Sequence, residues 1–235
     1  MSSASREAPD PSAKGARSGV LRYSVSHFLG ALALMIVAMP FVEDIEGGLW
    51  EPILFSLVLL SGVLAVGARR STLIGAAVFA IVALVGKWMS PLHAANLPEG
   101  YIAIAALLFV GFLIVHLFRY IVRAPVVDSE VIAAGIAIYL LLGLIWSIAY
   151  MLVARLNPDA FVIAVGPDSE RTMNRSRALY FSFVTLSTVG YGDIVPVSKA
   201  ARVLAITEAT TGLFYLGVLI ARLVSAYAPP ARSGR

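Results

Sequence analysis

Cysteine is absent from the sequence, and its absence excludes several kinds of site. A chain without thiols forms no disulfide, offers no thiolate ligand to a metal and has no cysteine nucleophile. Histidine is scarce as well: His27, His93 and His116 lie far apart and form no H-E-x-x-H pair, so we expect no metal site of that kind. Because the sequence also lacks a nucleophile elbow and a phosphate-binding loop, we expect neither an enzyme nor a bound cofactor.

Charged residues are few. They make up 14% of the 235 residues, whereas 59% are hydrophobic; a soluble domain has about a quarter charged residues. The apolar residues are concentrated in long blocks that are almost free of charge, which is typical of a membrane protein. In such a protein, the net charge of +4 indicates cytoplasmic loops. We therefore expect membrane lipids, and no nucleic acid, among the partners.

Six apolar blocks are long enough to cross roughly 30 Å of hydrocarbon at about 1.5 Å per residue. They are approximately residues 24–42, 49–67, 71–89, 101–122, 131–153 and 200–227. The polar, Ser- and Gly-rich residues before them predict a disordered cytoplasmic tail over 1–22. The fold expected from this pattern is an all-α membrane protein with six transmembrane helices.

Arginines in the loops predict the orientation of the chain. One side carries Arg22, the Arg69-Arg70 pair, Arg119, Arg123 and the C-terminal residues Arg222, Arg232 and Arg235. An excess of positive charge marks the cytoplasmic side, although the arginines in the loop after the fifth block go against this trend. We therefore expect a multi-pass protein of the plasma (cell inner) membrane with both termini in the cytoplasm.

A shorter apolar segment, residues 177–187, lies between the fifth and sixth blocks. Its helix would be about 16 Å long, which is too short to span the membrane. A glycine-rich turn follows it directly. This order predicts a re-entrant helix and loop, which are allowed inside a membrane only where the backbone is buried in protein or lines a water-filled path.

That loop has the sequence Thr188-Val189-Gly190-Tyr191-Gly192. A potassium filter uses backbone carbonyls to replace the water shell of the ion. Directing successive carbonyls toward one axis requires unusual backbone angles at alternate residues, which glycine adopts at little steric cost. We expect the carbonyls of the first four residues to bind K⁺, with a further oxygen layer from the threonine hydroxyl. The valine and tyrosine side chains should point away from the axis.

On these residues, the sequence resembles the pore module of the tetrameric potassium channels over roughly residues 131–227. The resemblance implies two membrane helices that flank a pore helix and a selectivity filter. One loop cannot surround an ion, so we expect a homotetramer that conducts K⁺ passively. The expected domains are the tail 1–22, a four-helix transmembrane domain 23–123, a pore domain 130–227 and a C-terminal tail 228–235.

Asp193, Tyr180 and Val184 are the expected supports of the filter. The resemblance is imperfect here, because Tyr180-Phe181 stands where many family members have two tryptophans and Val184 stands where some have a glutamate. Phe181 has no hydrogen-bond donor, whereas the Tyr180 hydroxyl can reach Asp193. These departures put filter-based inactivation in doubt and leave K⁺ selectivity as the expectation.

In the last block, Gly212 stands where many family members have a hinge glycine; close helix packing is the alternative. Leu213, Leu216 and Ile220 recur at helical spacing and resemble the family's cavity-lining and gate face, with ordinary helix packing as the alternative. Glu208 is the only acid deep in a membrane block and lies about 100° from that face. We favour a carboxyl hydrogen-bonded to the back of the pore helix over direct contact with an ion.

The six-helix layout resembles the voltage-gated superfamily, but the gating arginines are missing. Residues 101–118 contain no arginine or lysine, and only Arg119 and Arg123 follow. Because voltage sensing needs charges that cross the field, we expect weak or no voltage dependence. Two other functions stay open: a potassium transporter subunit, which usually has four diverged loops in one chain, and a non-conducting regulatory subunit.

Overall fold

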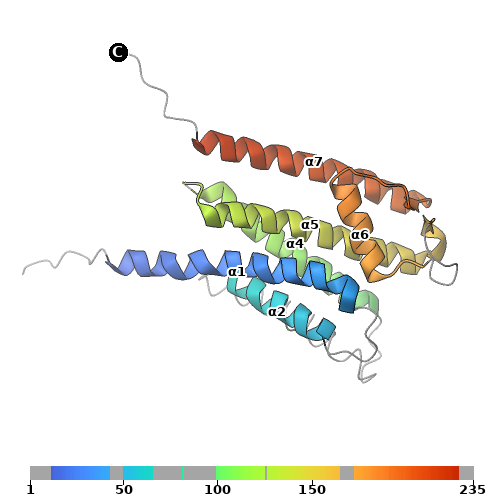
Figure 1. Ribbon diagram of the computed structural model, residues 1–235, viewed down its shortest axis with the longest axis horizontal. Helices are drawn as coiled ribbons and strands as arrows, with labels where there is room; N and C mark the ends of the chain where they lie inside the picture. The colour runs from blue at the N-terminus through green and yellow to red at the C-terminus, as the bar shows by residue number, and fades with distance from the viewer. Residues whose placement is uncertain are drawn as a thin grey trace, which may run out of the picture.

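The computed structural model describes residues 12–42, 50–65, 81, 99–124, 126–164 and 172–227. In chain order, the described elements are α1 (Ser12–Val42), α2 (Trp50–Ala65), α4 (Glu99–Arg123), α5 (Ser129–Leu156), the short 3-10 helix η1 (Pro158–Ala160), β1 (Phe161–Ile163), α6 (Arg175–Leu186), β2 (Ile194–Pro196) and α7 (Lys199–Tyr227). The long helices lie side by side, and the short α6 crosses obliquely between α5 and α7 near one end of the bundle (Figure 1).

Helix α5 is the centre of the bundle, because it contacts α1, α4, α6 and α7. It begins after Asp128, whose side chain accepts a hydrogen bond from the backbone N–H of Val131 at 3.0 Å and so caps the first turn. Its apolar side chains Ile138 and Leu141 are buried in a core that also contains Leu113 of α4. The short helix α6 and the loop after it are therefore packed against a well-buried helix.

Five of the six expected membrane blocks coincide with described helices, namely α1, α2, α4, α5 and α7. The third block, residues 71–89, lies outside the described residues apart from residue 81. Among the described helices, three are long and apolar enough to cross a membrane: Ala103–Arg123, Ser129–Leu156 and Lys199–Ser225. Val25–Phe41 is a shorter apolar stretch. A mostly helical protein with helices long and apolar enough to cross a membrane is thus confirmed, while the number six stays a prediction.

The first helix begins earlier than the sequence predicts. Residues 1–22 are expected to be a disordered tail, but α1 begins at Ser12, so this expectation is wrong for residues 12–22. Ala13, Lys14, Ala16 and Arg17 all have good helix propensity, which lets the membrane helix extend toward its N-terminus. Residues 1–11 and the expected C-terminal tail lie outside the described residues.

The expected all-α fold is incomplete, because β1 and β2 form a two-stranded antiparallel sheet. Phe161 pairs with Pro196 and Ile163 pairs with Ile194. Each strand has three residues, and the two are about thirty positions apart in sequence, so the local pattern gives little sign of them. The sheet fixes the segment that follows the glycine-rich loop against the segment that follows α5.

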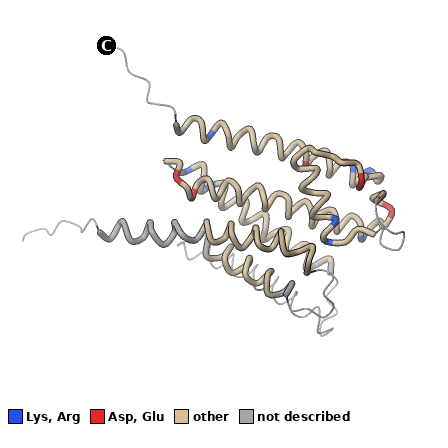
Figure 2. The backbone as a smooth tube through the Cα atoms, in the orientation of Figure 1, with Lys and Arg blue, Asp and Glu red and all other residues tan. Residues whose placement is uncertain are grey.

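Charged residues lie mainly at the two ends of the bundle, and the middle is almost free of them (Figure 2). This distribution matches a helical bundle whose central zone faces hydrocarbon. Helix α1 begins and α7 ends at the same end of the bundle, whereas α6, β1 and β2 lie toward the opposite end (Figure 1).

Candidate ion-conducting site

Helix α6 is the expected pore helix, and the structure has it within two residues of its predicted bounds. Its first turn is capped by Asn174, whose Oδ1 accepts a hydrogen bond from the N–H of Arg177 at 2.8 Å. Its last turn ends at Leu186, directly before the filter segment, which we define as residues 188–192. The C-terminus of a helix carries a partial negative charge, so α6 presents a field that favours a cation to the start of this segment.

The backbone of the filter segment alternates in the way that a carbonyl filter requires. Thr188, Gly190 and Gly192 have positive φ angles of 59°, 58° and 80°. The two glycines adopt this left-handed region freely, whereas a β-branched threonine there is strained by roughly 1–3 kcal/mol. The prediction of unusual angles at alternate residues is confirmed, and it extends to the threonine.

The N–H groups at the start of the filter segment bind the last turn of α6. Thr188 N–H donates to Thr185 O at 2.9 Å, and Val189 N–H donates to Val184 O at 2.9 Å. Val184, an expected filter support, therefore contacts the filter segment through its backbone carbonyl. Within the described part of the chain, no carbonyl of the filter segment accepts a backbone hydrogen bond. These carbonyls are left available to an outside ligand.

Tyr180 supports the outer part of the filter segment. Its hydroxyl donates to Asp193 Oδ2 at 2.7 Å, as the sequence predicts. Its ring also stacks on Tyr191, with centroids 6.5 Å apart and planes at 4°, so the Tyr191 side chain is directed toward α6. The hydrogen bond to Asp193 raises the pKa of the Tyr180 hydroxyl to about 12. The donor therefore keeps its proton at neutral pH.

Phe181 has no donor, and the structure uses it in a different way. It is buried in an aromatic cluster with Tyr150 of α5 and Phe161 of β1, with ring centroids 4.8 and 5.6 Å apart. All three pairs meet edge to face, a favourable arrangement of aromatic rings. The cluster joins α5, α6 and the small sheet behind the filter segment.

Glu208 of α7 is fully buried, with 0% of its surface exposed in the single subunit. Tyr150 of α5 donates a hydrogen bond to its Oε2. Its Oε1 lies 2.5 Å from the Oγ of Ser182 on α6, and that Oγ lies 2.7 Å from the carbonyl oxygen of Gly143. The interpretation favoured from the sequence, a carboxyl hydrogen-bonded to the back of the pore helix, is confirmed, and full burial is incompatible with direct ion contact.

Two partners of Glu208 were not predicted from the sequence. Tyr150 and Ser182 each have 0% of their surface exposed. A lone acid in an apolar helix implies that it has polar partners. The available signal for those partners was the presence of polar residues within the apolar segments that form α5 and α6. Which of them meet Glu208 depends on how α6 crosses α5 and α7, and helical periodicity does not specify that crossing.

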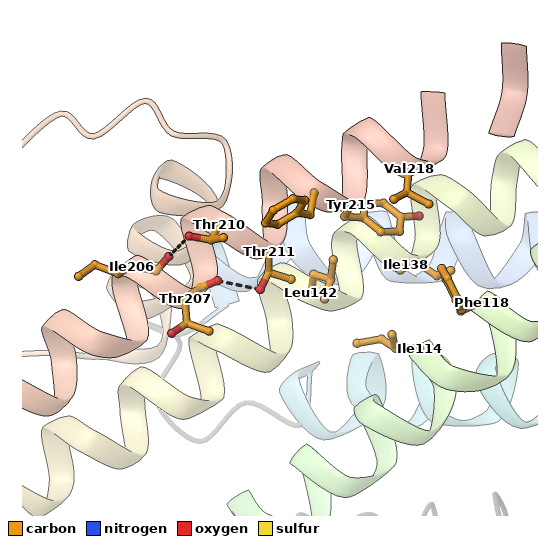
Figure 3. Close-up of a pocket in the computed structure, with 11 residues that line it drawn as sticks. Ile114, Phe118, Ile138, Leu142, Ile206, Thr207, Thr210, Thr211, Tyr215 and Val218 are labelled. Carbon is orange, nitrogen blue, oxygen red and sulfur yellow. Dashed lines mark hydrogen bonds between the residues drawn. The ribbon is translucent and has the colours of Figure 1, made fainter. Parts of the chain in front are cut away.

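Helix α7 has two exposed faces. Leu213, Leu216 and Ile220, the predicted cavity and gate residues, are 61%, 38% and 59% exposed on one of them. The other borders a groove of about 500 Å³ between α7 and the α4–α5 pair (Figure 3). Its lining consists of Ile114, Phe118, Ile138, Leu142, Ile206, Thr207, Thr210, Thr211, Phe214, Tyr215 and Val218. The three predicted cavity residues lie outside this groove, so their role stays a prediction.

The groove offers few free polar groups despite its three threonines. Thr210 donates to Ile206 O at 2.8 Å, and Thr211 donates to Thr207 O at 2.7 Å, as Figure 3 shows. Thr207 itself donates to Val203 O at 2.8 Å. The hydroxyl protons are therefore taken up by α7's own carbonyls, which leaves a lining suited to apolar contacts.

Residues 131–228 match the family model described as "Ion channel". This stretch contains nearly all of α5, together with α6, the filter segment and α7. These are the elements that form and hold the candidate site. The part of the chain that holds the candidate site is therefore similar to this family of ion channels.

Several curated proteins named as potassium channels are similar to parts of the chain. "Two-pore potassium channel 4" of Arabidopsis thaliana is 52% identical over 48 residues, which are 20% of this chain and 17% of that protein. "Two pore potassium channel b" of Oryza sativa subsp. japonica is 41% identical over 76 residues, or 32% of this chain and 21% of that protein. "Voltage-gated potassium channel Kch" of Escherichia coli is 46% identical over 57 residues, or 24% and 13%.

The chain spans about a fifth or less of the length of these three relatives. No solved structure matches the chain. Together, the family model and the relatives support the expected resemblance to the tetrameric potassium channels.

Proposed function

We propose that the chain is a subunit of a K⁺-selective channel that conducts K⁺ passively through a filter built from four copies. In this channel, the backbone carbonyls of Thr188, Val189, Gly190 and Tyr191 replace the water shell of the ion. The observation that carries the proposal is the filter segment itself. It has positive φ at alternate residues, and its carbonyls accept no backbone hydrogen bond from the described residues.

A homotetramer follows from the geometry of the ion. One filter segment presents its carbonyls from one side only, whereas K⁺ must be surrounded, so copies around a four-fold axis are required. The surface of α7 supports assembly, because only 11% of its most apolar 18-residue stretch is buried in the single chain. Leu213, Leu216 and Ile220 would then face the central cavity, and Gly212 would allow α7 to bend there.

The proposed location is the plasma (cell inner) membrane, with lipids around the helices and both termini in the cytoplasm. It is supported by the arginine-rich loops and by the start of α1 and the end of α7 at one end of the bundle (Figure 1). The glycine-rich filter segment then lies near the outer face. K⁺ is the permeant ligand, and the proposal needs no cofactor and no nucleic acid.

We also propose that the membrane voltage has little or no control over opening. The basic residues of α4 among the described positions, Arg119 and Arg123, lie in its last two turns. A charge at the helix end crosses little of the field when the helix moves. The domain of residues 23–123 then acts as a collar around the pore domain.

Potassium flux from liposomes tests the proposed function. The purified protein is reconstituted, and its oligomeric mass is measured in the same preparation. We expect a tetramer that releases K⁺ down its gradient and retains Na⁺ in otherwise identical liposomes. A monomeric particle, equal K⁺ and Na⁺ release, or K⁺ movement that requires a second co-transported ion would contradict a passive, selective channel.

A further inference from the structure

The buried cluster around Glu208 contains more contacts than its hydroxyl protons can supply if the acid is ionised. Three oxygen–oxygen contacts are present: Tyr150 to Glu208, Ser182 to Glu208, and Ser182 to the carbonyl of Gly143. Each hydrogen bond needs one proton. Tyr150 and Ser182 contribute one each, a carbonyl contributes none, and a carboxylate only accepts. An ionised Glu208 leaves one of these short contacts without a proton.

A protonated Glu208 supplies the missing proton. Tyr150 then donates to Oε2, the Glu208 hydroxyl donates to Ser182 Oγ, and Ser182 donates to Gly143 O. All three contacts become hydrogen bonds that run in one direction from α5 through α7 and α6 back to α5. The arrangement also avoids a buried unpaired charge, which is costly in a low-dielectric interior.

In the described part of the chain, no positively charged group acts on the Glu208 carboxyl. Among the described residues, the titratable groups that interact with Glu208 are Tyr150 and Tyr139 of α5, and α6 contributes the non-titrating Ser182. No lysine or arginine of the described residues is paired with it. Because Glu208 is 0% exposed within one subunit, neither an ion in the pore nor a residue of a neighbouring copy can reach it without rearrangement.

We propose that Glu208 is a neutral carboxylic acid whose proton closes this chain of hydrogen bonds, and that it is a positioning residue for the filter. It connects the centre of α7 to Ser182, which lies two and three residues before Val184 and Thr185, whose carbonyls accept hydrogen bonds from the filter segment. The position of α7 is thereby linked to the helix that holds the filter segment. The inference deepens the proposed function. The role of Glu208 in conduction depends on that function, whereas the protonation state of Glu208 does not depend on it.

Infrared difference spectroscopy of the reconstituted full-length protein tests the proton directly. The spectrum of Glu208→Gln is subtracted from that of the original protein at neutral pH, which isolates one carboxyl group. We expect the difference to contain the carbonyl stretch of a protonated acid. Bands of an ionised carboxylate in its place would overturn the inference, whether or not the protein conducts.

Rescue by a conservative variant tests the positioning role. A glutamine amide can accept from Tyr150 and donate to Ser182, as a neutral acid does, whereas Glu208→Met has a similar length and no polar atom. We expect Glu208→Gln to keep K⁺ flux within about twofold. Glu208→Met should lose about tenfold or more, because the buried Tyr150 hydroxyl loses its acceptor and the hydrogen bond between α7 and Ser182 is lost. Equal flux in the two variants, measured on tetramers of equal yield, would overturn the positioning role of Glu208. Absence of flux in the original protein would instead contradict the proposed function.

Discussion

Gly212 of α7 lies directly against the backbone carbonyl of Leu186, the last residue of α6. A Cβ atom built on Gly212 would stand 2.3 Å from that carbonyl oxygen, far inside any allowed contact. The glycine thus lets the inner helix touch the end of the pore helix at the point where the filter segment begins. Close packing is sufficient to require glycine here, while its service as a hinge stays a prediction.

The Gly212 contact predicts that Gly212→Ala destabilises the packing of α7 against α6 within the subunit. The added methyl group must push the backbone of α6 or α7 aside, at a cost of roughly 1–3 kcal/mol. We expect a lower temperature of thermal unfolding and reduced K⁺ flux. The matched control is Gly217→Ala on the same helix, where an added Cβ meets no atom within 4 Å in the subunit. Equal effects of the two substitutions would show that the contact is unimportant.

The positive φ of Gly190 predicts that Gly190→Ala damages selectivity. No atom lies within 4 Å of an added Cβ, so the penalty is conformational and amounts to about 1–2 kcal/mol for a left-handed residue. The backbone is expected to rotate and to turn a carbonyl away from the ion. The K⁺/Na⁺ permeability ratio should fall at least severalfold, measured beside Gly30→Ala in α1, where the added Cβ also meets nothing. An unchanged ratio would contradict the backbone account of the filter.

The hydrogen bond between Tyr180 and Asp193 is expected to slow the decay of K⁺ current during prolonged recording. Tyr180→Phe removes the donor and keeps the ring that stacks on Tyr191, so the outer part of the filter segment loses one fixed contact. We expect steady K⁺ current to decay faster, by several-fold, during prolonged recording. Asp193→Asn keeps an oxygen that accepts from Tyr180 and should decay more slowly than Tyr180→Phe. The reverse order would show that the charge, not the hydrogen bond, matters.

The basic residues at the end of α4 predict how the channel responds to voltage. Moving one charge through the whole field is worth about 2.3 kcal/mol for roughly every 100 mV, so steep gating needs several charges inside the span. We expect a shallow conductance–voltage relation that hardly changes when Arg119 and Arg123 are both replaced by glutamine. A steep relation that becomes shallow in the double variant would instead make these residues voltage sensors.

The sequence predicted the parts of the site that depend on local chemistry. The length of the apolar segment predicts α6, and the glycines predict the filter backbone. A lone acid implied that Glu208 needs a polar partner. The sequence did not predict the β1–β2 sheet, because two three-residue strands about thirty positions apart have no local signature. It also missed Tyr150, since its meeting with Glu208 depends on the angle at which three helices cross.

The most direct test of a carbonyl filter is the reversal potential of the purified protein in a planar bilayer, with K⁺ on one side and Na⁺ on the other. Four converging filter segments should pass K⁺ and exclude Na⁺, so the current should reverse far from zero, at a voltage that opposes K⁺ flow. A reversal potential near zero would mean that both ions pass equally well, and it would contradict the account.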